Sequence, residues 1–471
     1  MTFVRTDIWS LGDEQDPWHP TLLAYAKAVR AMQSLPIGNA RSWRYQAAIH
    51  GVAGVVPPAG APWNACQHAS WYFLPWHRMY LYRFEQIVRT FLTAADDPTD
   101  WALPYWDYSS GAPGNALPPA FRERLLPSGA ANPLLVTARR ASVNKGDALP
   151  ASVVDNSDAL AEPVFTGSVL GASTGFGGPR TGFAHQGPAF GVLEAQPHGP
   201  VHVHVGGSTG LMRDPNTAAL DPIFWLHHAN IDRLWEVWRG NGHANTTDTT
   251  WRGFRFTLRD GTGAAVTMRP RDVLDTVGQL DYTYDSLPAV AAVPEEVPVT
   301  ERPEPVLIGA TETPIEVTRR GATTQLAVEP APENLAAAVD GPPPQTYLNL
   351  ADIEGEVNPG IVYGVYLNLP DRLRADRSDA ERAEHLAGVA SFFGIELTTA
   401  AGAADSGEEA HAMRYSFNVT NLVNRLQSRG EWDPTRVTVT LHPVDGSDEP
   451  ETAAAGVESP IRIGTVSVYQ G

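Results

Sequence analysis

Two groups of histidines are the residues of this chain whose type and spacing could do metal chemistry. The first group is His50, His68 and His77, and the second is spread over residues 198–228. Imidazole-rich sites suit zinc, copper, iron or nickel. Two groups that each supply three imidazoles predict a pair of metal ions. The second group has more members than one ion needs: His198, His202, His204, His227 and His228.

The spacing of these histidines indicates which of them share a helix. His198 and His202 are four residues apart, so on a helix both rings would project from one face and could bind one metal. Alone this pair is weak evidence, because histidines at helix caps or on surfaces are common. A second triad of the same chemistry favours a binuclear site. Capping, surface or supporting roles are the simpler interpretation for the other histidines: His19, His185, His204, His227, His243, His385, His411 and His442.

Helical periodicity surrounds both groups. Apolar residues recur at helical spacing in 19–35, 40–51, 77–95 and 228–240, with His77 and His228 opening the last two segments. Gly- and Pro-rich loops join them. We therefore expect a mainly α domain, a helical bundle with long loops, whose core is a common place for metal ions.

The second part of the chain has a different pattern. Residues 289–303 are rich in Pro and Glu and are typical of a linker. Short β-branched and aromatic segments follow, with a helical interruption expected over 379–393. This predicts a helical, metal-binding domain over 1–288 and an all-β, sandwich-like domain over 304–471.

Composition excludes several functions. The net charge of −19 over 471 residues repels phosphate backbones, so nucleic acid is not an expected partner. The single cysteine, Cys66, allows no internal disulfide. No apolar run is long enough to span a membrane and no signal peptide is visible, so a cytoplasmic protein is the default expectation, with export by another route as the alternative. The sequence gives no signal for an oligomeric state.

Two longer motifs resemble the copper-binding signatures of the type-3 copper family, in particular tyrosinases and catechol oxidases. CQHASWYFLPWHRMYLYRFE resembles the CuA signature, and PHGPVH followed by DPIFWLHHANIDRLW resembles the CuB signature. The resemblance implies two copper ions used with O2. It implies CuA ligands His50, His68 and His77, and CuB ligands His198, His202 and His228. The family pattern places the last ligand four residues after Phe224, which selects His228 over His227.

The resemblance also implies roles for residues around the copper ions. In the family, a cysteine at the position of Cys66 can be bonded through sulfur to the ring of the histidine at His68. Phe224 would stack over the copper pair as a gate. Glu194 would hold a water and help to deprotonate a phenol. Asp232 would orient a ligand or pair with an arginine.

Residues at the two ends of the helical domain resemble a clasp. Arg5 and the pair Tyr282 and Tyr284 match the arginine and the tyrosine motif that join these ends in the family. A guanidinium group over an aromatic face is a favourable contact. This supports a domain boundary soon after Tyr284.

The implied activity is oxidation of o-diphenols to o-quinones. Gly199 stands where strongly monophenol-active members often have asparagine, which counts against efficient hydroxylation of monophenols. The C-terminal domain resembles one that covers the copper site in latent enzymes, so an activating protease is an expected partner. An o-aminophenol oxidase and a haemocyanin-like oxygen carrier stay as alternatives, and a hydrolytic zinc enzyme is disfavoured.

Overall fold

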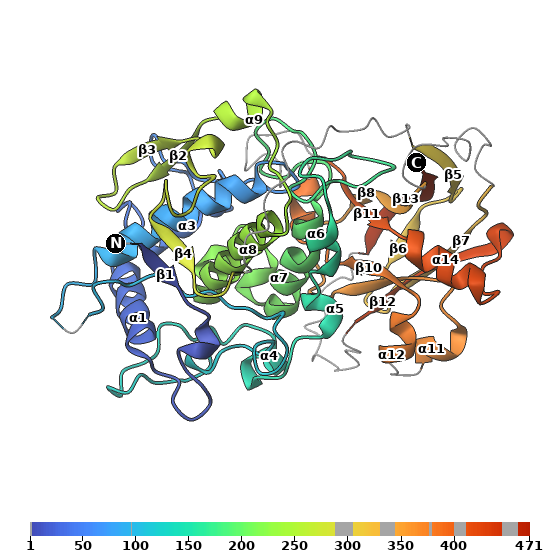
Figure 1. Cartoon of the computed structure of the whole chain (residues 1–471). Coiled ribbons are helices and arrows are strands. Elements are labelled where there is room, and N and C mark those ends of the chain that lie inside the picture. Colours follow the sequence, from blue (N-terminus) through green and yellow to red (C-terminus); the bar gives the residue numbers. More distant parts are fainter. Residues whose placement is uncertain are drawn as a thin grey trace.

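The computed structural model describes residues 2–95, 97–287, 305–329, 344–375, 379–399, 411–444 and 460–471. These residues form a helical domain and a β-rich domain that lie side by side (Figure 1). The linker expected over 289–303 lies outside the described residues. Among the described residues, no helix has both the length and the apolarity needed to cross a membrane.

Capped helices form the N-terminal domain. His19 accepts a hydrogen bond from Thr21 N at the start of α1, and Asp221 accepts one from Ile223 N at the start of α8. In both helices a proline follows the cap, where its missing N–H costs nothing. The helices are α1 (Pro20–Gln33), α2 (Trp43–His50), α3 (Phe73–Arg89), α4 (Ala141–Lys145), α5 (Ala151–Val154), α6 (Ser157–Ala161), α7 (Gly199–Gly206), α8 (Pro222–Gly240) and α9 (Thr249–Gly253).

Helices α3 and α8 pack against each other at the centre of this domain (Figure 1). The rings of Phe84 and Trp225 stack between them with centroids 3.4 Å apart. Both helices begin earlier than expected, so His77 and His228 lie inside them and do not open them. The apolar residues before each histidine are buried and extend the packed face toward the N-terminus.

The ends of the helical domain meet in a small sheet. Strand β1 (Phe3–Arg5) pairs in parallel with β4 (Tyr282–Tyr284). Arg5 lies over the ring of Tyr282, with Cζ 3.8 Å from its centroid, and donates to Tyr284 Oη at 3.0 Å. The clasp expected from the sequence is confirmed. A separate hairpin is formed by β2 (Phe256–Arg259) and β3 (Ala265–Met268).

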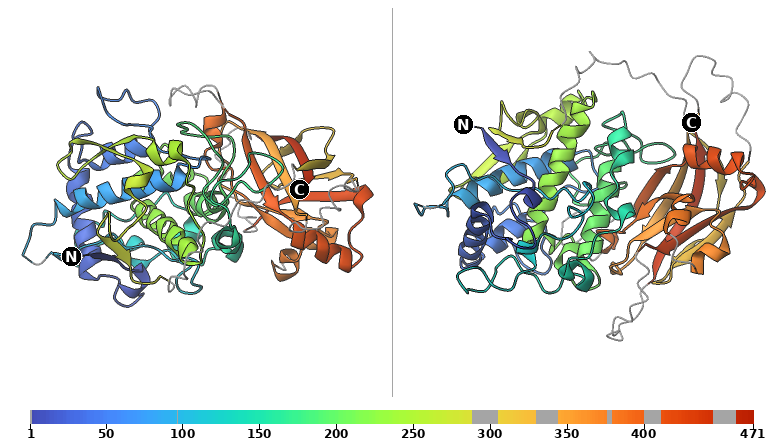
Figure 2. Two further views of the ribbon diagram at one scale, coloured as in Figure 1. Left: turned by 45° about the horizontal axis from the view of Figure 1, so that its top comes forward. Right: turned by 60° about the horizontal axis from the view of Figure 1, so that its bottom comes forward.

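Two antiparallel sheets with a shared apolar core build the C-terminal domain (Figure 2). One has the order β10-β9-β12-β7, and the other has the order β11-β8-β13-β5 with β6 also paired to β13. The strands are β5 (Val306–Ala310), β6 (Ile315–Val317), β7 (Ala322–Leu326), β8 (Thr346–Glu354), β9 (Tyr363–Leu367), β10 (Leu386–Ala390), β11 (Met413–Asn418), β12 (Val437–Pro443) and β13 (Ile461–Gln470). The helices are α11 (Asp371–Ala375), α12 (Asp379–Ala383) and α14 (Thr420–Ser428).

The helix expected over 379–393 is wrong for most of its length. Helix α12 ends at Ala383, and β10 follows as an edge strand paired with β9. The ladder with β9 overrides the helical propensity of the alanines here. After β10, residues 391–396 form a turn that we call the capping loop. Gly394 takes a φ of +80° in it, where glycine carries no steric penalty.

Candidate metal centre

The first histidine triad comes from two helices and a loop. His50 ends α2, His77 lies in the second turn of α3, and His68 lies on the loop before α3. All three are buried. Their ring centroids are 5.1 Å apart for His50 and His68, 5.4 Å for His68 and His77, and 5.6 Å for His50 and His77.

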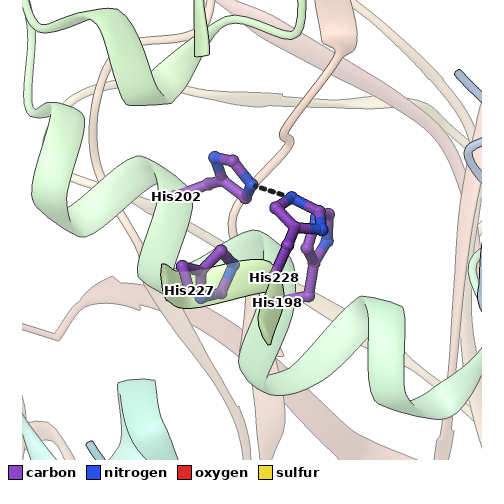
Figure 3. Close-up of side chains that lie close together, drawn as sticks. All are labelled: His198, His202, His227 and His228. Atoms are coloured by element: carbon purple, nitrogen blue, oxygen red, sulfur yellow. Dashed lines mark hydrogen bonds between the residues drawn. The ribbon is translucent and has the colours of Figure 1, made fainter. Parts of the chain in front are cut away.

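The second triad comes from α7, the turn before it and α8. His198 ends the turn η3 (Glu194–His198), His202 lies one helical turn later on α7, and His228 lies in the N-terminal half of α8. Figure 3 shows their rings gathered together with that of His227. The centroids of His198 and His202 are 4.6 Å apart, and Nε2 of His202 lies 3.2 Å from Nε2 of His228.

The two triads face each other and form one cluster. The rings of His77 and His228 stack with centroids 4.4 Å apart and an interplanar angle of 13°. His68 and His198 also stack, at 5.8 Å. The ligand atoms of His50, His77 and His228 all lie within 4.8 Å of one another, although these residues were assigned to different ions. The division of the ligands between two ions therefore stays a prediction.

Backbone carbonyls fix the orientation of half of these rings. Nδ1 of His50 donates to Pro215 O at 2.9 Å, and Nδ1 of His77 donates to Phe73 O at 2.8 Å. Nδ1 of His202 donates to Met212 O at 2.8 Å. An imidazole that carries its proton on Nδ1 presents a lone pair on Nε2, as a metal ligand must.

The Nε2 atoms on the opposite side of these rings are available to bind a metal ion. Nε2 of His50, His68, His77 and His198 is buried and has no hydrogen-bond partner among the described residues. Burial lowers the pKa of His77 to about 3, and burial together with neighbouring histidines lowers the pKa of the other five histidines of the two triads well below the usual value. Neutral, desolvated nitrogens without partners are costly unless they coordinate a metal ion.

Cys66 lies beside the ligand on the loop. Its Sγ is 3.3 Å from Nδ1 of His68 and 3.0 Å from Nδ1 of His185. The proximity supports a bond between Cys66 and His68, which stays a prediction. His185, interpreted from the sequence as a supporting or surface residue, is buried behind the sulfur. Sequence spacing could not find it, because it lies more than a hundred residues away in the chain.

Glu194 reaches from the second triad to the first. Both of its carboxylate oxygens lie 2.9 Å from the backbone N of Ala69, the residue after His68. Burial raises the pKa of Glu194 well above its usual value, and N–H groups of Ala69 and Gly191 oppose this rise. Glu194 thus fixes the loop that carries His68, while its role in holding a water stays a prediction.

Phe224 packs directly on the ligands. Its ring centroid is 4.8 Å from that of His50 and 4.2 Å from that of His228. A second phenylalanine, Phe393 of the capping loop, stacks on His202 at 4.3 Å with an angle of 22°. Sequence reasoning missed Phe393, because the segment was expected to be helical and its motif, SFFG, has no distinctive spacing.

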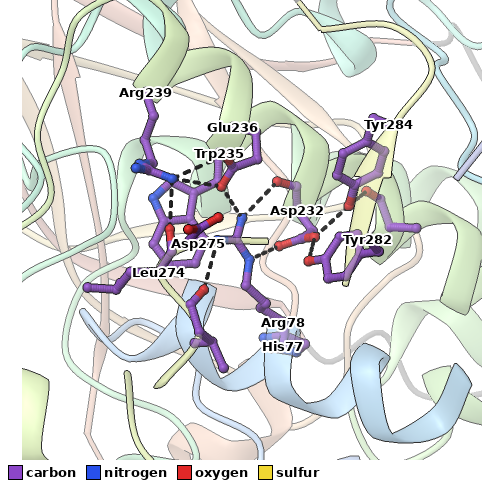
Figure 4. A network of polar contacts seen from close by, with 12 residues as sticks. His77, Arg78, Asp232, Trp235, Glu236, Arg239, Leu274, Asp275, Tyr282 and Tyr284 are labelled. Atoms are coloured by element: carbon purple, nitrogen blue, oxygen red, sulfur yellow. Dashed lines mark hydrogen bonds and ion pairs between the residues drawn. The ribbon is translucent and has the colours of Figure 1, made fainter. Parts of the chain in front are cut away.

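Asp232 pairs with two arginines, the second of the two roles considered for it. Figure 4 shows its contact with Arg78. Asp232 accepts from Nη1 of Arg5 at 3.1 Å and from Nε of Arg78 at 2.5 Å, and both tyrosines of β4 donate to it. Burial alone would raise the pKa of Asp232, but Arg78 and Arg5 hold it below its usual value. Because Arg78 follows His77, this network fixes α3 against α8 beside a ligand.

Two further histidines of the second group take different places. The ligand atoms of His227 lie within 4.8 Å of those of His198, His202 and His228. The choice of His228 over His227 as the ligand therefore stays a prediction. His204 is buried on α7 outside the groups of potential metal ligands among the described residues.

Comparisons with known families agree with this geometry. Residues 40–241 match the common central domain of tyrosinase, and residues 304–471 match a domain of unknown function. A tyrosinase from Hahella sp. is 34% identical over 99% of this chain and 98% of its own length. The latent form of a polyphenol oxidase from Prunus armeniaca is 28% identical over 90% of this chain and 70% of its own.

A solved structure shows the same two-domain fold. Latent apple tyrosinase superposes with a TM-score of 0.62 and 22% identity, covering 100% of this chain and 97% of its own. At this identity the match supports the fold only. It includes the arrangement of a helical domain next to a β-rich domain.

Proposed function

Because this chain belongs to the tyrosinase/polyphenol oxidase family, a family of copper oxidoreductases, we propose that it oxidises o-diphenols to o-quinones with O2 and is latent while its C-terminal domain is in place. The observation that carries the activity is the cluster of six buried imidazoles, all of which belong to groups of potential metal ligands whose ligand atoms lie within 4.8 Å of one another. The observation that carries the latency is Phe393, which stacks on one of these imidazoles.

We assign the first copper to His50, His68 and His77, and the second to His198, His202 and His228. When bound, the copper pair binds O2 and accepts the electrons of the substrate. The imidazoles add no charge, because burial keeps them neutral. The three carbonyls that accept from Nδ1 hold the rings in place before any substrate arrives.

The place of Phe393 indicates where a substrate ring binds. Its ring stacks on that of His202 and makes T-shaped contacts with the rings of His68 and His198, with centroids 5.6 and 5.5 Å away. A diphenol ring of similar size would stack in the same place once Phe393 has left. The surrounding aromatic wall excludes water, which strengthens polar interactions with the hydroxyl groups.

Contacts between the domains hold Phe393 in this place. Side chains of the helical domain donate to backbone carbonyls of the C-terminal domain: Arg213 to Asn358 O, and Arg140 to Gly360 O at 2.7 Å. Asn358 in turn donates to Ser391 O and Phe392 O, at 3.0 and 2.8 Å. One asparagine therefore couples the domain boundary to the capping loop.

Copper content and turnover before and after cleavage test this proposal. The purified, copper-loaded chain should hold two coppers and turn over catechol slowly, and limited proteolysis within 289–303 should raise that rate. Tyrosine should be a poor substrate in both states, given Gly199. A single bound metal, or reversible O2 binding without catechol turnover, would refute the assigned activity. Faster turnover of o-aminophenol than of catechol would reassign the substrate class.

A further inference from the structure

The loops between α6 and η3 lie on the side of the helical domain that faces the C-terminal domain (Figure 1). Within them, residues 164–177 fold back on themselves into a hairpin that we call the arm. Phe176 N donates to Val164 O at 2.8 Å near its base, and Ser168 N donates to Ser173 O at 2.9 Å near its tip. The arm contributes to neither histidine triad, so its purpose must lie elsewhere.

The base of the arm is fixed in the helical core. The ring of Phe176 stacks on that of Trp238 in α8, with centroids 4.4 Å apart and an angle of 7° between the planes. The ring of Phe165 packs edge-on against Trp251, with centroids 5.2 Å apart. Both phenylalanines are at most 2% exposed. The tip of the arm therefore projects from a rigid support.

The tip contacts the C-terminal domain beside its first and last strands. Ala172 O accepts from Oγ of Ser416 on β11 at 2.8 Å. A Cβ atom on Gly171 would lie 2.8 Å from Cδ1 of Tyr469 on β13 and 3.1 Å from Cβ of Pro305, which directly precedes β5. Gly171 also has a φ of +79°, a value that favours glycine. The tip is thus shaped to lie against the C-terminal domain without a side chain in between.

The sheet face that meets the arm is polar. Directly opposite residues of neighbouring strands place their side chains on the same face, so Asn349 and Ser467 share the face of Ser416. Asn349 is 0% exposed, and its amide has no hydrogen-bond partner among the described residues. Burial of an unpaired amide costs free energy, and interfaces that separate are more polar than permanent ones. This contact therefore suits a domain that binds and also leaves.

We propose that the arm is a second docking site for the C-terminal domain, apart from the capping loop, and that it sets how tightly this domain stays bound once the linker is cut. In the intact chain the linker keeps the domains at a high effective concentration, so even weak contacts hold them together. After cleavage the same contacts must hold two separate polypeptides, and the docked fraction falls on dilution. This inference rests on the latency proposed above.

The test measures the association of the two fragments after cleavage of the copper-loaded chain in the linker. Analytical ultracentrifugation over a range of protein concentrations gives their Kd. Ser416→Ala removes the hydrogen bond to the tip and should raise Kd about fivefold. Gly171→Ala places a methyl group against Tyr469 and Pro305 and should raise Kd about tenfold or more. Gly129→Ala is the matched control, because Gly129 has a φ of +80° with open space around it, and should leave Kd unchanged.

Catechol turnover separates this inference from the latency itself. The specific activity of the cleaved enzyme should rise on dilution as the C-terminal domain leaves. The rise should begin at a higher protein concentration in Ser416→Ala and Gly171→Ala than in the unchanged chain. Equal Kd values in the unchanged chain and both variants would overturn the role of the arm, whatever their activity. A higher Kd in both variants, with an activity that does not depend on dilution, would support the arm and refute the latency alone.

Discussion

Two phenylalanines contact the histidine cluster, and they are held in very different ways. Phe224 belongs to α8, the central helix, and is fully buried among residues of its own domain. Phe393 is equally buried but stands on a turn of another domain. One ring is part of the site, and the other occupies it.

The contacts that hold the helical domain and the capping loop explain why the two phenylalanines differ. Below, the side of the site that carries Phe224 is called the permanent wall, and the capping loop with Phe393 is called the removable wall. The helical domain fixes its ligands through a large aromatic core and a buried charge network. The capping loop depends on Asn358 and on two arginines that donate across the boundary to carbonyls. The first kind of support is lost only on unfolding, whereas the second can be lost by separating two domains.

Among substitutions in the permanent wall, removal of the proposed ligand His202 should have the largest effect on activity. We expect His202→Ala to lower copper content and to reduce catechol turnover of the cleaved enzyme by more than about a hundredfold, since loss of a mere outer-shell partner can already cost that much. Metal analysis and initial rates measure this. His204→Gln, on the same helix, is the matched control and should keep two coppers. Equal copper content in both variants would remove His202 from the ligands.

The charge network should be the next most sensitive feature of that wall. Asp232→Asn removes the carboxylate that Arg5 and Arg78 share, while Glu85 still pairs with Arg5 and Glu236 still pairs with Arg78. We therefore expect a loss of about 3 kcal/mol in the free energy of unfolding, the lower end for a broken buried ion pair. Urea unfolding of the cleaved enzyme measures it. Asp272→Asn, whose partner Arg271 is about half exposed, should cost almost nothing. A similar small loss in both variants would contradict the structural role of Asp232.

Removal of the Phe393 ring should raise activity, whereas loss of a proposed copper ligand should lower it. Phe393→Ala should raise catechol turnover of the intact chain by about tenfold or more, because it removes a buried aromatic contact that favours docking. Turnover after cleavage should be unchanged. Initial rates of both forms test this, and an intact variant as slow as the unchanged chain would show that another residue blocks the site.

The smallest expected effect is a pH dependence of domain docking. Burial, and then the nearby Asp214, raises the pKa of Glu396 to about 7, while Asn358 N and Arg213 oppose the rise. A carboxyl with a raised pKa destabilises the closed state as it ionises, so docking should weaken from about pH 5 to pH 8. After correction for the intrinsic rise of amide exchange with pH, hydrogen exchange of the capping loop should therefore quicken a few-fold over this range. Glu396→Gln should abolish that change, and a pH effect that survives it would exclude Glu396.

Much of the metal centre could be predicted from the sequence, because its signals are local. The motifs around His68, His77, His198 and His228 carry ligand identity and helical spacing within short segments. The strands after residue 344 were also predictable, because they alternate or are β-branched. The two-ring clasp at Arg5 followed from resemblance and was confirmed.

The rest depended on contacts between distant segments. Phe393 is separated from His202 by almost two hundred residues, and no periodicity marks it. The alanines of 379–393 favour a helix locally, and only pairing with β9 makes part of them a strand. His185 likewise reaches Cys66 only through the fold. Contacts between distant segments determine the structure at such positions, and local patterns in a single sequence do not reveal these contacts.

The short turn η4 (Leu211–Arg213) connects the proposed metal site with the contact between the two domains. Met212 orients the ring of His202, and the next residue, Arg213, binds the C-terminal domain. Two equilibria thus share one segment of three residues. By thermodynamic reciprocity, any change that domain separation makes in the affinity for copper must equal the change that copper makes in domain association. We therefore expect metal loading to change how readily the C-terminal domain separates. Chains with and without metal should be activated by a protease at different rates.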